Sequence, residues 1–168
     1  MEEIRSINDR ENGFRYEIKP GANIRSANLG SVDLGRADLR DADLRRTYLR
    51  GANFYYADLR DADFRGAMLM LADFRGAMLS SAEFRGAMLS SADFSDANLE
   101  DADLMRAYLQ CANLRSANLR SANLRSVDLR SATLEDAILW GADLRDADLR
   151  DADLRRADLR DADLRKVN

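Results

Sequence analysis

Residues 37–41 read Ala-Asp-Leu-Arg-Asp, and residues 147–151 read the same five letters again. This pattern runs without a slip from residue 22 to residue 167, with a large apolar side chain at every fifth position. The 29 large positions hold 23 Leu, 5 Phe and 1 Ile, and the 30 small positions of the same period hold 26 Ala, 3 Val and 1 Thr. The fold must therefore accommodate a hydrophobic period of five residues.

This period fits neither of the common regular structures. Successive residues of an α-helix are rotated by about 100°, so steps of five would spread the leucines around the whole cylinder. On a flat strand, side chains alternate between faces, so an odd step would put successive leucines on opposite sides. All the leucines reach one axis if the chain turns by about 90° every five residues, so that four repeats close a square coil. We expect an all-β fold, a β-solenoid of about seven stacked coils of 20 residues.

The repeated Ala-Asp-Leu-Arg-Asp, with the general form A(D/N)LXX, resembles the pentapeptide-repeat family. The resemblance covers about seven-eighths of the chain. It implies a right-handed quadrilateral β-helix, and the handedness comes from the resemblance alone. Some proteins of this family imitate duplex DNA and protect or inhibit DNA gyrase, while many others have no assigned biochemical role.

The chain divides into residues 1–21 and the repeat region of residues 22–168. Residues 2–10 are expected to form a short helix, and apolar residues alternate with charged ones over residues 14–18, as in a strand. The first coil of a solenoid exposes an apolar lumen and free backbone groups, so we expect residues 4–18 to cap it. The alternative is a disordered tail.

Composition limits the possible functions. The formal charge is −4, from 26 basic and 30 acidic residues, which argues against a general attraction to nucleic acid or to an anionic membrane. The chain has no His, which excludes imidazole ligands and His-based catalysis, and we expect neither a metal nor a cofactor. The single cysteine, Cys111, has no partner for an internal disulfide. No segment resembles a signal peptide or a membrane span, so a cytoplasmic protein is expected.

Nothing in the repeats indicates an enzyme. Carboxylates recur in every repeat, so no pair stands out, and no P-loop, GxGxxG, CxxC or nucleophile–base motif is present. No insertion interrupts the repeats, although catalytic groups usually lie on such loops. We therefore predict a non-enzymatic structural or protein-interaction module, a rigid rod that binds a protein partner or itself. The alternative, implied by the resemblance, is a DNA-mimicking modulator or protector of DNA gyrase, a role that needs a strongly acidic surface.

Residues 20 apart should stack, so the surface is a set of columns. One column is basic and consists of Arg25, Arg45, Arg65, Arg85, Arg125, Arg145 and Arg165. A neighbouring acidic column consists of Asp43, Asp63, Glu83, Asp103, Asp143 and Asp163. The acidic column offsets the repulsion within the basic one, and we interpret the pair as a solvated face. A site for an anionic partner is the alternative.

A second group of surface residues is apolar, although the lumen is already filled by leucines. It consists of Tyr48, Met68, Met70, Leu71, Met88 and Tyr108. Exposed apolar patches often mark contact sites, and Met surfaces adapt to varied partners. We predict a protein-contact face here, with neutral drift as the alternative. The pairs Tyr55–Tyr56 and Ile138–Trp140 would extend such surfaces or have no role.

The last coil should leave apolar side chains uncovered. Its large positions are Leu149, Leu154, Leu159 and Leu164. Such an end favours end-to-end association, so these leucines are the candidate contact of a homodimer. The alternative is a truncated or frayed end.

Packing of the lumen is also predictable. Phe54, Phe74 and Phe94 should stack in one column, with Phe64 and Phe84 in the opposite one. Thr47 is the one polar residue at a small position, and its hydroxyl should bond to nearby backbone.

Overall fold

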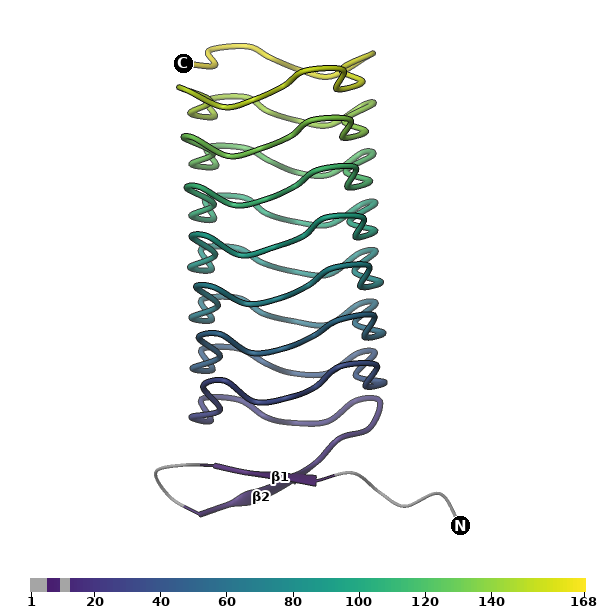
Figure 1. Ribbon diagram of the computed structural model, residues 1–168, viewed down its shortest axis with the longest axis vertical. Helices are drawn as coiled ribbons and strands as arrows, with labels where there is room; N and C mark the ends of the chain where they lie inside the picture. The colour runs from purple at the N-terminus through teal and green to yellow at the C-terminus, as the bar shows by residue number, and fades with distance from the viewer. Residues whose placement is uncertain (1–5, 10–12) are drawn as a thin grey trace.

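The computed structural model describes residues 6–9 and 13–168 of the chain (Figure 1). Its two strands are β1 (Ser6–Asn8) and β2 (Arg15–Glu17), which pair antiparallel with Ser6 opposite Glu17. From residue 22 onward the chain winds into a tower of stacked coils. The β1–β2 hairpin lies at one end of this tower, and the C-terminus lies at the other (Figure 1).

Adjacent coils are joined by backbone hydrogen bonds between equivalent positions, four pentapeptides apart in the chain. Parallel bridges in the described chain begin with Asn23 opposite Asp43 and end with Asp143 opposite Asp163. In each bridge the N–H of the large residue donates to a carbonyl of the next coil, as Leu44 N–H does to Asp63 at 2.8 Å. Since this register makes each coil from four repeats, the predicted β-solenoid is confirmed.

Each corner of a coil is a tight turn with one residue of positive φ. The N–H of the small residue donates to the preceding large residue, as Ala42 does to Leu39 at 3.1 Å. The residue just before the small one lies in the left-handed region, for example Asp41 at φ 58°. In the described chain 24 non-glycine residues adopt positive φ, although each costs on the order of 1 kcal/mol or more. The coil-to-coil bonds, such as Asp41 N–H to Arg60 at 3.0 Å, hold the corners in place.

The lumen is a continuous apolar core. The rings of Phe54 and Phe74 stack at 4.8 Å with 2° between their planes. Phe64 meets Phe74 edge to face at 5.9 Å, so the two columns alternate along the axis. Thr47 is fully buried, and its hydroxyl donates to the Leu44 carbonyl at 2.6 Å. Both predictions about lumen packing are confirmed.

The hairpin contributes to the core at the N-terminal end. Ile18 is buried, and Ile7 and Tyr16 are partly buried against the first coil. The Asp9 carboxylate is 4% exposed and accepts the Asn28 N–H at 2.9 Å. Higher in the tower this N–H position donates to the coil below, so Asp9 supplies the acceptor that the first coil lacks.

The helix predicted over residues 2–10 is wrong over Ser6–Asn8, which pair with β2 instead. Backbone pairing across the hairpin outweighs local helix propensity in so short a segment. Residues 1–5 and 10 lie outside the described part of the chain. Phe14, placed in the cap by the alternation, is 63% exposed. The division into a capping segment of residues 1–21 and a β-helix of residues 22–168 stays a prediction.

We expect Leu99→Asp to unfold the tower, because the Leu99 side chain is 0% exposed and a carboxyl group there has no partner. The melting temperature, followed by circular dichroism, should fall by about 10 °C or more. Asn98→Asp is the matched control, since residue 98 is on the outside of the same repeat and should melt almost as the wild type does. Equal melting curves for both variants would show that the inward assignment is wrong.

Candidate protein-contact face

Many surface charges are paired within their own repeat. Arg45 contacts Asp43 at 2.5 Å and also Asp63, in the coil above, at 3.3 Å. The same arrangement recurs where Asp and Arg stand two residues apart, as in Asp163 and Arg165 at 2.6 Å. Such exposed pairs add little to stability, about 0–1 kcal/mol each. These pairs neutralise part of the basic column locally, namely Arg45, Arg65, Arg145 and Arg165, in line with its interpretation as a solvated face.

These arginines depress the pKa of their carboxylate partners. Arg160 and Arg165 donate hydrogen bonds to Asp158 and Asp163, which lowers the pKa of each carboxyl group from 3.8 to about 2. The pKa values of Asp43 and Asp143 shift in the same direction, because Arg45 and Arg145 donate to them.

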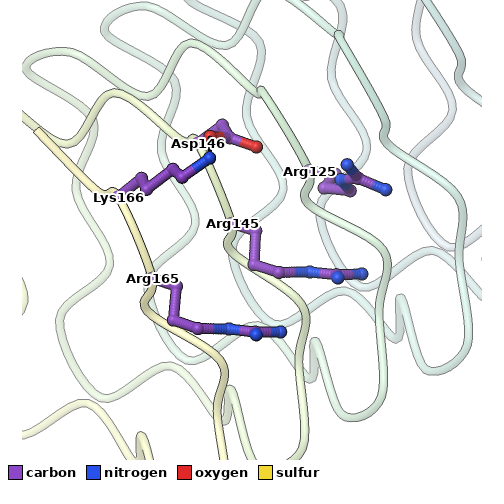
Figure 2. A pocket seen from close by; sticks show the side chains of 5 residues that line it. All are labelled: Arg125, Arg145, Asp146, Arg165 and Lys166. Atoms are coloured by element: carbon purple, nitrogen blue, oxygen red, sulfur yellow. Dashed lines mark ion pairs between the residues drawn. The ribbon is translucent and has the colours of Figure 1, made fainter.

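Part of the basic column lines a shallow cavity of about 160 Å³ (Figure 2). Its lining residues are Arg125, Arg145, Asp146, Arg165 and Lys166. Figure 2 shows Arg145 and Arg165 extending in the same direction from neighbouring coils. Arg145 is held by an aspartate at 2.5 Å, and Lys166 lies 3.9 Å from Asp146. A small anion would therefore compete here with carboxylates that already hold Arg145, Arg165 and Lys166, while Arg125 has no ion pair among the described residues.

The structure brings the predicted apolar column together. Tyr48, Met68, Met88 and Tyr108 follow one another in consecutive parallel bridges. Tyr48 is 48% exposed, Met88 39% and Tyr108 49%, while Leu69 and Leu89 beside them are fully buried in the lumen. We call the six residues Tyr48, Met68, Met70, Leu71, Met88 and Tyr108 the Tyr/Met face.

Leu71 is the residue of this face that folding explains least. It occupies a corner position with φ 62°, where a bulky side chain is strained, and it is 55% exposed. Stacked positions of the same corner column hold Gly51 and Ser91, which suit such a corner without exposing apolar surface. Cys111 continues this column as an exposed thiol.

The other surface aromatics have partners within the chain. The indole N–H of Trp140 donates to Asp161 at 2.7 Å, and the Arg120 guanidinium lies 3.8 Å above the ring. Tyr56 covers Gly76, where an added Cβ would meet its ring at 2.5 Å. Ile138 is 41% exposed.

The leucines of the last coil lie at one end of the tower. Leu149, Leu154 and Leu159 are partly buried, and Leu164 is 43% exposed. Leu149, Leu154 and Leu159 pack against the apolar core. The role of the four leucines in a homodimer stays a prediction.

Sequence reasoning missed a buried carboxylate. Glu135 is 8% exposed and lies 2.8 Å from Arg156 and 3.2 Å from Arg115. It links three successive coils, since these residues belong to neighbouring levels of one corner. The sequence does contain one indication of it. Glu135 directly follows Leu134, and most repeats have a basic or small residue at that position.

Among residues 6–9 and 13–168, no group of three or more acidic or Cys side chains is arranged to hold a metal ion. Within the same residues, no helix has the length and apolar character needed to cross a bilayer.

Comparison with known proteins identifies the class. The family model for pentapeptide repeats matches residues 27–66, 67–104, 97–136 and 128–165. The chain therefore belongs to the pentapeptide-repeat family, and its tower is a right-handed quadrilateral β-helix, as predicted. A search of the curated proteins gave no match.

Two trypsin-treated variants of QnrB1, described as a plasmid-mediated fluoroquinolone resistance protein, have similar solved structures. One is 25% identical with a TM-score of 0.73, over 89% of this chain and 84% of that one. The other is 24% identical with a TM-score of 0.75, over 90% and 85%. The pentapeptide repeat protein Rfr23 from the cyanobacterium Cyanothece 51142 is 24% identical, with a TM-score of 0.50 over 87% of both chains.

The double variant Met68→Asp, Met88→Asp should keep nearly all the stability of the wild type, because both side chains point outward. We expect the free energy of unfolding, from urea denaturation, to change by about 1 kcal/mol or less. A much larger loss would mean that these methionines belong to the core.

Acid should weaken the fold through the paired aspartates. Their pKa is depressed in the folded chain, so their contribution is present above the unfolded pKa and is lost as the pH falls toward about 2. We expect the urea midpoint to drop between pH of about 4 and about 2. Asp163→Asn should flatten this dependence; a midpoint that does not change with pH in the wild type would contradict the account.

Proposed function

We propose that this pentapeptide-repeat chain is a non-enzymatic protein-interaction module whose Tyr/Met face binds a protein partner. One observation carries the proposal: a column of apolar side chains, in which Tyr48, Met88 and Tyr108 are exposed and Met68 is half-buried, stands in register on a tower whose lumen is already full. These side chains contribute little to folding where they stand, whereas exposed apolar patches of this kind mark contact sites.

The chemistry of the face fits such a contact. Tyr48 and Tyr108 offer large, rigid surfaces with a polar tip, and Tyr is enriched among the residues that dominate binding energy. Met68 and Met88 lie between them and can adapt their shape to a partner. The hydrogen bonds between coils hold the backbone of these four residues in fixed positions, which lowers the entropy lost on binding.

The second candidate is a modulator or protector of DNA gyrase. The similarity to QnrB1, a fluoroquinolone resistance protein, favours this candidate. A DNA mimic needs a strongly acidic surface, but here arginines are paired with many of the aspartates, as with Arg60 and Asp58 at 2.6 Å. The net charge of −4 is small for such a role. We therefore favour the Tyr/Met face as the functional surface.

Self-association is a second mode of the same proposal, through the leucines of the last coil. Sedimentation of the wild type and of a Leu159→Asp, Leu164→Asp variant tests it. A dimer in the wild type that dissociates in the variant would support end-to-end contact, and unchanged sedimentation would reject it.

Affinity capture from a lysate of the source organism, quantified by mass spectrometry, tests the contact face. We expect a protein that the wild type retains and that the Met68→Asp, Met88→Asp variant loses. Met78→Asp with Ile138→Asp is the matched control, because both residues are 41% exposed at the same repeat position on another face.

Equal capture by the variant and the wild type would reject the Tyr/Met face as the binding surface. The second candidate would be established instead if the wild type inhibits gyrase supercoiling or protects gyrase, and if the double variant does so equally well.

A further inference from the structure

The Tyr/Met face is locally basic although the whole chain is acidic. The four stacked segments 46–51, 66–71, 86–91 and 106–111 contain three arginines and no Asp or Glu. These arginines are Arg46, Arg50 and Arg106. No ion pair within residues 6–9 and 13–168 involves any of them, in contrast to neighbours such as Arg45 and Arg65. The apolar surface therefore has unneutralised cations at its borders.

One border of the face is a column of four corner positions that reads Arg46, Gly66, Gly86, Arg106. A Cβ added at Gly66 would lie 3.7 Å from Cγ of Arg46, so the Arg46 side chain extends along the column. A Cβ added at Gly86 would meet nothing within 4 Å. The corner at Gly86, beside Met88, is thus open, whereas the Arg46 side chain lies over the corner at Gly66. The column has an arginine at each end.

The fold does not require this combination of residues. Glycine relieves the strain of positive φ, but the tower accepts Arg46 at φ 56° and Ser126 at φ 54° in the same corner position. Leu71 lies on the opposite border, where it is exposed and has a strained positive φ. Folding does not require a leucine at this position either. A partner that occupies the open space accounts for both borders together.

We propose that the Tyr/Met face binds a polypeptide segment with an apolar centre and acidic residues on both sides of it. The inference rests on the proposed function and specifies its partner. The apolar centre covers Met68 and Met88, and the flanking carboxylates pair with Arg46 and Arg106. Three coil spacings, about 14 Å, separate the two arginines, a span that an extended segment of four or five residues covers.

Charge complementarity selects this occupant over a second copy of the chain. A two-fold contact between two Tyr/Met faces would place Arg46 or Arg106 of one copy against arginines of the other. Like charges brought together in an interface oppose association. Carboxylates on a partner instead form charge-assisted, often bidentate, hydrogen bonds with arginine and steer the encounter.

Selection from a random 12-residue peptide display library tests the inference with the full-length chain as bait. Peptides that the Met68→Asp, Met88→Asp variant also captures are discarded. Among the remaining peptides we expect Asp or Glu on both sides of an apolar centre. The affinity of a synthesised peptide, from fluorescence anisotropy, should fall at least about tenfold with Arg46→Glu or with Arg106→Glu.

Arg36→Glu is the matched control. Arg36 has the same corner position with φ 58° and no ion pair in the described chain, but it lies on another corner of the tower. Its replacement should leave the affinity unchanged. Exchange of the peptide's acidic flank for lysines should restore binding to the Arg106→Glu variant.

Three results would overturn the inference. The first is that the peptides require Met68 and Met88 for binding but have no acidic residues on either side, or that their affinity does not change with Arg46→Glu and Arg106→Glu. This result would reject the inference and leave the proposed function intact. Failure to select any peptide that depends on the two methionines would reject both. Concentration-dependent self-association abolished by Met68→Asp, Met88→Asp would show that a second copy covers the face.

Discussion

The hydrogen bonds between coils are the interaction on which the rest of this structure depends. One coil buries nothing by itself, because its leucines become a core only when another coil lies above and below them. Stacking in this register lines up the lumen side chains, satisfies the backbone and holds every corner at a positive φ. The hairpin takes the place of a neighbouring coil for the first coil, because Asp9 accepts the hydrogen bond from the Asn28 N–H.

Different positions of each repeat serve stability and recognition. Residues at two of every five positions fill the lumen, so outward positions are free to vary without loss of the core. Many of them carry Asp and Arg pairs that neutralise each other, as Asp43 and Arg45 do. The Tyr/Met face departs from that background in two ways, since it is apolar and its neighbouring arginines are unpaired. Both departures occur at the same level of the tower, which is the basis for assigning them one partner.

The period of five was sufficient to predict the coil, the register and the alternating Phe columns, because each follows from which side chains must reach the axis. It could not predict the helix-or-strand choice at Ser6–Asn8, which depends on pairing with β2. It also contained no information on the positive φ at each corner. The Tyr/Met face could be predicted from the sequence, because its apolar residues are not needed to fill the lumen. That Arg46 and Arg106 form no ion pair could be seen only in the structure. Glu135 was missed because its burial depends on arginines in the coils on both sides of its own.

Hydroxyl-radical footprinting of the methionines tests the central claim most directly. Met78 and Met88 have nearly equal exposure, 41% and 39%, but only Met88 belongs to the Tyr/Met face. The account predicts that both oxidise readily in the free chain, and that a bound partner protects Met88 and leaves Met78 reactive. Slow oxidation of Met88 in the free chain, or equal protection of both methionines, would contradict it.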